Sequence, residues 1–308
     1  MTKLLVVFGA TGNQGGSVIR TVLGTKELST TYKVRAVTRD STKPAALKLK
    51  ELGAEVVEAD YNDQPAISKA LYGADTVFAV TMTGFETIGS LTIEYEQGKL
   101  IADESVKAGA RYLIWSTSVD VERATNGQLS VPHFQVKYNV EKYIRGLPIK
   151  SAFFSPGTFM SNFTSMMRYT KQEDGSYTTP VIFDPETRLP LLNVEESGKF
   201  VAPILLDQAK WEGKIIPGAT KFYSTTEISE AISRSTGKKV IFQKVQDEVI
   251  GSFLPKEMLA MYKLQNDFGY FGFKGAKAEE WIDESAEQAV GELTTFDKFL
   301  KTNAPKLE

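Results

Sequence analysis

A glycine-rich stretch near the start of the chain, Gly9-Ala-Thr-Gly-Asn-Gln-Gly15, has the spacing of an anion-binding loop. It follows an apolar run at residues 4–8 and precedes residues 18–23, whose apolar positions recur at helical spacing. Glycines allow a tight turn between strand and helix, and the amide groups of the helix then donate to a pyrophosphate. The stretch therefore predicts a dinucleotide site, and the alternative is a glycine turn that binds no ligand. We assign the contacts to Gly9, Thr11, Gly12, Asn13, Gln14 and Gly15.

The residues after the second predicted strand indicate which dinucleotide binds. Proteins of this kind that bind NAD(H) usually have an acidic residue here, which hydrogen bonds to the ribose hydroxyls. This chain has Thr38 and Arg39, and a guanidinium can hold the 2′-phosphate of NADP(H) with two hydrogen bonds. Lys43 adds positive charge nearby. NADP(H) is therefore favoured over NAD(H); alternatively, Arg39 is a solvated surface residue and Asp40 binds the ribose.

Three further strand ends supply predicted cofactor contacts. Asp60 and Tyr61 follow the third strand, where they would flank the adenine, although an ordinary turn fits the same residues. Thr81 follows the fourth strand, and Pro156 follows the sixth, where backbone groups would lie near the carboxamide of the nicotinamide. Because the carboxyl ends of parallel strands lie at one edge of a sheet, these residues should meet at one site.

Four polar residues could carry a reaction beside the nicotinamide. Ser116 and Ser118 close the fifth predicted strand, and His133 and Lys137 lie four residues apart on the following helix, hence on one face. A histidine titrates near ~6.5, so it donates a proton only when charged. The competing interpretations are a partly exposed histidine at a helix start and serines that are simply polar strand-end residues.

The elements that position these residues alternate between strand and helix. This order predicts an α/β fold, a Rossmann-type doubly wound parallel sheet with helices on both faces. The predicted strands are residues 4–8, 33–37, 54–58, 76–80, 112–115 and 149–154. The predicted helices lie within residues 18–23, 45–52, 65–71, 93–108 and 134–144.

The pattern changes after Pro156 and Gly157. We therefore expect a dinucleotide-binding domain at residues 1–155 and a smaller, mixed α+β lobe at residues 156–308. The lobe has hairpin-like strands at 177–183 and 188–192, a short strand at 221–224 and helices at 194–206 and 226–236. Residues 213–216 and 240–244 also have strand character and could join the main sheet.

Two groups of large apolar residues in the lobe have open interpretations. The first is a loop cluster interrupted by glycines, which would line a cleft for a small apolar ligand, face a protein partner or, most simply, anchor the loop in the core. It consists of Phe268, Tyr270, Phe271 and Phe273. The second group is more typical of core than of a substrate site. It consists of Phe159, Phe163, Met166 and Met167, at helical spacing.

Composition excludes several classes of function. The 308 residues have a formal net charge of -2 and no concentrated basic run, which argues against direct nucleic-acid binding. There is no cysteine and only one histidine, so disulfides, thiolate metal sites and multi-histidine metal sites are excluded. No apolar stretch approaches the ~18 residues of a membrane span, and no secretion signal is apparent. We expect a cytoplasmic protein, with the nucleus as a second location.

Five segments resemble the NmrA-like family, a group of atypical short-chain dehydrogenase/reductases. They are residues 6–18, 37–39, 53–60, 97–103 and 155–163. The family contains nitrogen-metabolite-repression regulators, a redox sensor that prefers NADP(H) and some reductases. The resemblance extends over nearly the whole chain and implies an NADP(H)-binding Rossmann fold; it is also compatible with a homodimer.

Catalytic members of the wider superfamily carry a Tyr-x-x-x-Lys pair, whereas this chain has His133-Phe-Gln-Val-Lys137. The missing tyrosine favours a sensor, in which NADP(H) changes the affinity for a protein partner. Isoflavone-reductase-like relatives lack this tyrosine too, and use a lysine at this position as acid and base. The resemblance thus also implies an alternative: an NADPH-dependent reductase of an apolar carbonyl, quinone or enone, with Lys137 or His133 as proton donor. A metabolite-binding module with a structural cofactor is a third hypothesis.

Overall fold

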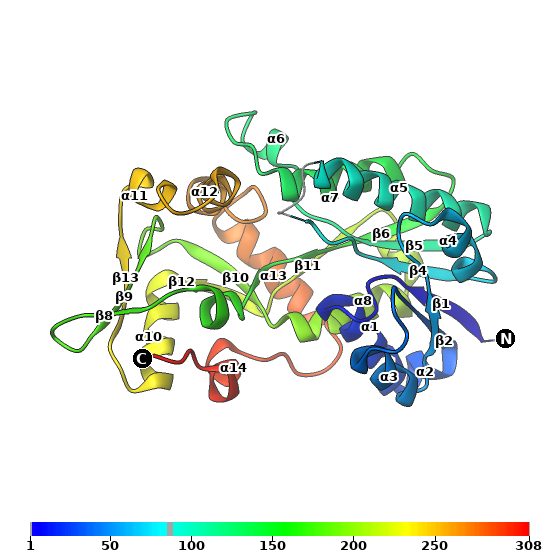
Figure 1. The fold of residues 1–308 in the computed structure, drawn as a ribbon, viewed down its shortest axis with the longest axis horizontal. Coiled ribbons are helices and arrows are strands. Elements are labelled where there is room, and N and C mark those ends of the chain that lie inside the picture. The colour runs from blue at the N-terminus through cyan, green and yellow to red at the C-terminus, as the bar shows by residue number, and fades with distance from the viewer. Residues whose placement is uncertain (1, 85–88, 308) are drawn as a thin grey trace.

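The computed structural model describes residues 2–84 and 89–307 of the chain. A parallel sheet with its helices forms one end of the molecule, and the smaller sheets of the C-terminal half form the other (Figure 1). None of the helices within the described residues is long and apolar enough to cross a membrane.

The main sheet has seven strands in the order β11-β6-β5-β4-β1-β2-β3, and every neighbouring pair is parallel. The strand order reverses between β1 and β4, which is where such sheets bind ligands. The sheet confirms the predicted doubly wound fold. Its strands are β1 (Lys3–Val7), β2 (Tyr32–Thr38), β3 (Glu55–Glu58), β4 (Thr76–Ala79), β5 (Tyr112–Ser116), β6 (Lys150–Pro156) and β11 (Ile215–Gly218).

Both faces of this sheet are covered by helices, which explains why its inner strands are continuously apolar. Leu5 and Val7 of β1 belong to the core on one face, and Val6 belongs to the core on the other. The first face packs against α1 (Asn13–Gly24), α2 (Lys26–Thr31), α3 (Pro44–Glu51) and α8 (Ser197–Leu206). The second face packs against α4 (Gln64–Leu71), α5 (Ser90–Lys107) and α7 (Pro132–Ile144).

Two elements of the C-terminal half complete the N-terminal sheet. Strand β11 pairs with β6, so the strand expected near residues 213–216 does join the main sheet. Helix α8 packs on α1 so closely that a Cβ at Gly198 would lie 2.3 Å from the backbone oxygen of Ser17. The Gly198 amide donates to the Ser17 hydroxyl at 2.9 Å. The sheet is therefore assembled from both halves of the sequence.

The C-terminal half contains two three-stranded sheets, ordered β12-β10-β7 and β13-β9-β8. The expectation that residues 240–244 join the main sheet is wrong, because β13 pairs with β9 instead and β11 already takes the free edge of β6. The hairpin-like pairing of the strands near 177–183 and 188–192 is also wrong, because β10 pairs with β12 and β7. These strands are β7 (Thr158–Phe159), β8 (Thr170–Lys171), β9 (Tyr177–Val181), β10 (Arg188–Leu192), β12 (Lys221–Ser224) and β13 (Val240–Lys244).

Short helices surround these sheets. The helix expected near residues 226–236 is present as α10, and Ser224 and Glu227 form a capping box at its start. Single helical turns occur at Asn162–Met166, Val194–Glu196 and Leu264–Phe268. The remaining helices are α6 (Val121–Ala124), α9 (Gln208–Trp211), α10 (Thr225–Thr236), α11 (Asp247–Gly251), α12 (Lys256–Lys263), α13 (Ala276–Gln288) and α14 (Phe296–Asn303).

The glycine-interrupted aromatic loop joins the two ends of the molecule. Gly272 has a φ of 82° and packs so closely on Ala124 that a Cβ there would lie 2.6 Å from the Ala124 methyl carbon. The Tyr270 ring meets the Phe134 ring of α7 edge-on, with centroids 5.8 Å apart, and Phe271 packs on Trp281 of α13. The loop is therefore anchored in the core, as in the simplest interpretation of its sequence.

Candidate functional site

The turn between β1 and α1 depends on two glycines. Gly9 has a φ of 70°, and a Cβ there would lie 2.7 Å from a methyl carbon of Val80. A Cβ at Gly15 would lie 2.3 Å from the Gly9 oxygen. No side chain caps α1, and Thr11, Gly12 and Asn13 are exposed. The turn thus presents open backbone at a helix start, the arrangement that binds a pyrophosphate.

The side chains after β2 are those on which the predicted choice of cofactor depends. One carboxylate oxygen of Asp40 accepts from the Thr42 amide at 2.9 Å and from the Thr42 hydroxyl at 2.6 Å, and these bonds hold the pKa of Asp40 below its ordinary value. Arg39 is exposed, as is Lys43. Thr38 is buried, and its hydroxyl accepts from the Asp40 amide at 3.4 Å. Asp40 thus serves the local turn, whereas the Arg39 guanidinium faces solvent.

Tyr61 lies closer to the glycine turn than Asp60 does. Its ring packs edge-on against Phe8 with centroids 5.7 Å apart, its hydroxyl lies against the Gly9 backbone, and burial raises its pKa. Arg39 is near enough to act electrostatically on this hydroxyl. Asp60 accepts two hydrogen bonds from Asn62, at 2.8 and 2.9 Å. Of this predicted adenine-flanking pair, Tyr61 borders the loop, and Asp60 is exposed and shapes a turn.

Ser116 connects β5 to the glycine turn. Its hydroxyl donates to the Gln14 side-chain oxygen at 2.6 Å, which brings two predicted site residues together across β4. Ser118 and Pro156 are partly exposed at the ends of neighbouring strands β5 and β6. The intervening Thr117 instead donates to the buried Glu141 of α7 at 2.6 Å. The predicted contacts on the nicotinamide side thus lie at the edge of the sheet that is formed by the carboxyl ends of the strands. The glycine turn lies at the same edge.

Lys137 lies in a buried polar cluster that holds its ammonium group in place. Its Nζ donates to the backbone oxygen of Thr81 at 2.7 Å, contacts the Thr81 hydroxyl at 3.1 Å and forms an ion pair with Glu94 of α5. Glu94 is only 1% exposed and also accepts from the hydroxyls of Thr81 and Thr83, at 2.8 and 2.7 Å. Burial lowers the pKa of Lys137, and the Glu94 carboxylate opposes that shift. We name these four residues the lysine cluster.

The sequence prediction missed Glu94 and Thr83. Glu94 lies on the buried face of α5 with Gly98, Ile101 and Ser105. Buried carboxylates require partners, but α5 buries two of them, Glu94 and Glu104, so the sequence alone does not single out Glu94. Nothing in the sequence singles out Thr83 either.

His133 lies one helical turn before Lys137 in a site that disfavours a positive charge. Burial lowers its pKa to about 4, against an opposing effect of the Glu94 carboxylate, and the neighbouring Lys137 adds a smaller effect in the same direction as burial. Its ring meets the Phe134 ring edge-on with centroids 4.9 Å apart. With a pKa of about 4, His133 is mainly the neutral imidazole at pH 7.

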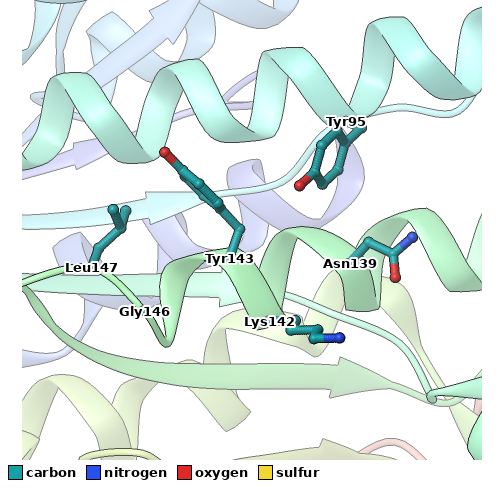
Figure 2. Close-up of a pocket in the computed structure, with 6 residues that line it drawn as sticks. All are labelled: Tyr95, Asn139, Lys142, Tyr143, Gly146 and Leu147. Carbon is teal, nitrogen blue, oxygen red and sulfur yellow. The ribbon is translucent and has the colours of Figure 1, made fainter.

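Two surface cavities lie near these elements. A groove of about 550 Å³ on α5 and α7 contains none of the predicted site residues (Figure 2). The hydroxyl of Tyr143, which lines it, donates to Asp103 at 2.7 Å. It is lined by Tyr95, Asn139, Lys142, Tyr143, Gly146 and Leu147. A second cavity, of about 370 Å³, borders the glycine turn at Thr11 and Gly12 and extends along α3. Within the part of the chain that the structure describes, no group of three or more acidic or histidine side chains is placed to hold a metal ion.

Comparison with known proteins identifies the family. A model of the NmrA-like family matches residues 1–300. An NmrA-like family domain-containing protein of Dictyostelium discoideum is 30% identical over an alignment of 317 residues that covers 100% of both chains. The NmrA-like family domain-containing oxidoreductase ptmS of Penicillium ochrochloron is 30% identical over 260 residues, 79% of this chain and 76% of that protein.

A solved structure has the same fold. The crystal structure of NmrA, a negative transcriptional regulator, in complex with NADP has a TM-score of 0.79 and 24% identity, and the match covers 98% of this chain and 95% of that chain. Because the family model covers nearly the whole chain and the sheet has the same architecture, the protein belongs to the NmrA-like family.

Proposed function

We propose that the protein is an NADPH-dependent reductase of an apolar carbonyl, enone or quinone, in which Lys137 donates the proton. The observation that carries this proposal is the lysine cluster: a charged amine, on a side chain only 16% exposed, at the strand edge that also bears the glycine turn. Removing an ammonium group from water is costly, and such groups are typical of functional sites. The name of the related protein ptmS, an oxidoreductase, agrees with this proposal.

The cofactor would lie along the carboxyl edge of the sheet. The α1 amides would receive the pyrophosphate, Arg39 the 2′-phosphate, and Tyr61 would lie toward the adenine. The nicotinamide cofactor would supply a hydride when it is bound. The Lys137 ammonium donates a proton to the substrate oxygen that accumulates negative charge, and it becomes a neutral amine that solvent reprotonates. The neutral His133 side chain lies beside Lys137 and forms a polar part of the lining of the site.

The surroundings of the lysine cluster indicate an apolar substrate. Met82 follows Thr81 and is 75% exposed, and Ile93 precedes Glu94 and is 44% exposed. Ligand sites are lined mainly by apolar side chains with a few polar groups, so these sequence neighbours of the lysine cluster are candidates for such a lining. Substrates with an extended apolar body should therefore react better than short polar carbonyls.

The test is NADPH consumption with a panel of quinones, enones and aromatic aldehydes. We expect turnover that falls about 10²- to 10⁴-fold in Lys137→Met, the usual contribution of a positioned acid. Lys142→Met, an exposed lysine of the same helix, is the matched control and should retain activity. Tight NADPH binding without consumption across the panel, or full activity of Lys137→Met, would contradict the proposal.

A cofactor sensor is the second candidate. It is favoured by His133 in place of the acid tyrosine, since the pKa of about 4 leaves that position uncharged. In a sensor, Lys137 would only hold the ribose, and NADP(H) occupancy would change the affinity for a protein partner. Binding without consumption, together with a partner whose affinity differs between the NADPH and NADP⁺ complexes, would support this function.

A further inference from the structure

We propose that Glu94 is a positioning residue that fixes the Lys137 ammonium at the strand edge and retains its proton until a substrate takes it. The inference rests on the reductase activity proposed above and extends it to a residue on a different helix. Glu94 belongs to α5, and Lys137 belongs to α7. The two helices pack side by side on one face of the sheet (Figure 1).

The first argument is the arrangement of donors and acceptors. An ammonium group has three protons, and Lys137 has three acceptors around it: the Thr81 backbone oxygen, the Thr81 hydroxyl and the Glu94 carboxylate. The carboxylate in turn accepts from the hydroxyls of Thr81 and Thr83. Each ammonium proton thus has a defined direction, and a substrate oxygen must replace one of these acceptors, for which the Thr81 hydroxyl at 3.1 Å is the candidate because the Thr81 backbone oxygen lies closer and Glu94 carries the countercharge.

The second argument is the close packing that supports this arrangement. A Cβ at Gly98, one turn after Glu94, would lie 2.7 Å from a methyl carbon of Val140 and 3.1 Å from the Trp115 ring. The Trp115 indole donates to the backbone oxygen of Lys137 at 3.0 Å. The helices approach this closely only because residue 98 is glycine. The separation of α5 and α7, and hence the reach from Glu94 to Lys137, is fixed by packing.

The third argument is electrostatic. Loss of the ammonium proton would leave the Glu94 carboxylate buried without its countercharge, which is costly. Glu94 therefore keeps the amine protonated although burial acts against its charge. Among the described residues, His133 on α7 also lies beside Lys137, and Glu257 on α12 acts on His133. A histidine does not change charge in the alkaline range in which a lysine titrates.

The decisive variant is Glu94→Gln, which keeps the shape of the side chain and removes its charge. Loss of an opposite charge at contact distance should lower the pKa of Lys137 by about one unit or more. The alkaline limb of the pH–rate profile should move to lower pH by the same amount, while turnover persists below that limb. A structural residue would lower activity at all pH values without moving the limb.

Glu96→Gln is the matched control, because Glu96 lies on the same helix, is exposed and pairs with Lys99 at 3.6 Å. It should leave the limb in place. Glu94→Asp keeps the charge on a shorter side chain, so it should retain the position of the limb with a reduced rate. If Glu94→Gln does not fold, the alkaline limb is measured in Glu94→Asp instead.

A second readout does not depend on turnover. In full-length protein labelled with ¹³C at lysine Cε, the Lys137 resonance is identified by its absence in Lys137→Met, and its titration gives the pKa directly. A lower midpoint in Glu94→Gln than in wild type and Glu96→Gln supports the inference even if no substrate of the panel is reduced. An unchanged midpoint overturns it and leaves the reductase proposal standing.

Discussion

The single histidine of the chain lies where a positive charge is unfavourable, and this can be measured directly. Because His133 is the only histidine, its two carbon-bound ring protons give the only histidine titration of the protein. We expect a midpoint at about pH 4, below the ordinary value, because burial outweighs the attraction of Glu94. Proton NMR of the ring in full-length protein is the measurement. A midpoint near the ordinary ~6.5 would show that the ring is solvated and would restore His133 as a candidate acid.

The same burial has a consequence for stability. The unfolded chain binds a proton at His133 below its ordinary pKa, whereas the folded protein binds it only near pH 4. The contribution of this residue is therefore complete above ~6.5 and is lost as the pH falls toward 4, by up to about 3 kcal/mol. Between pH 7 and pH 4, the unfolding free energy of His133→Gln should fall less than that of the wild type. Denaturant unfolding at several pH values is the measurement. An identical loss in the variant would contradict this expectation.

The proposed role of Arg39 is to select between the two pyridine dinucleotides. One carboxylate oxygen of Asp40 is engaged by Thr42, whereas the Arg39 side chain is exposed. We expect Arg39→Ala to weaken NADPH binding by about 10- to 100-fold, the value of hydrogen bonds to a charged group, and to leave NADH binding nearly unchanged. Titration calorimetry with both nucleotides is the measurement. Equal losses for NADPH and NADH would show that Arg39 does not contact the 2′-phosphate.

The residues of the site differ in how far the sequence reveals them. The glycine turn and the Arg39 position could be predicted because their chemistry is local: it follows from residue types beside one strand end. Glu94 could not, because its role depends on which helix packs against α7, and that contact joins residues 43 positions apart. The anchored positions of Tyr61 and Ser116 likewise became clear only from contacts across the sheet.

At the scale of elements, the contact between α1 and α8 tolerates no side chain at residue 198. Gly198→Ala would place a carbon 2.3 Å from the Ser17 backbone oxygen, so the helices would have to separate. We expect a loss of about 1–3 kcal/mol in unfolding free energy, typical of overpacking, measured by denaturant titration. Gly24→Ala at the exposed end of α1 meets nothing within 4 Å and should instead stabilise the protein by about 0.5–1 kcal/mol. Equal effects of the two substitutions would contradict the described packing.

Helices and strands could be predicted from the sequence where a single hydrophobic pattern specifies them. Strands buried on both faces appear as apolar runs, and β1, β4 and β5 were located in this way. The partners of β9, β10 and β13 were not predictable, because alternation shows that a segment is a strand without showing which edge it joins. Helix α2 was missed because its sequence, Lys-Glu-Leu-Ser-Thr-Thr, is short and largely polar.

At the scale of the whole molecule, the predicted boundary after residue 155 divides a core that both halves share. A fragment of residues 1–155 would lack β11 at the edge of β6 and α8 on one face, and would expose the Phe154 ring that stacks on Phe200 at 6.4 Å. We expect this fragment to show no cooperative thermal transition by circular dichroism, whereas the full chain shows one. A fragment of residues 1–218, which includes α8 and β11, is the control and should recover part of the transition. A fragment 1–155 that melts like the full chain would establish an independent domain.

The position of β11 in the sheet has a consequence for biosynthesis. A ribosome must have released Ile215–Gly218 from its exit tunnel before the edge of β6 is closed, although the glycine turn is among the first segments to emerge. Until then, the nascent chain carries an unpaired edge at β6. Chaperones that shield such surfaces have a defined interval in which to act, between the emergence of β6 and that of β11.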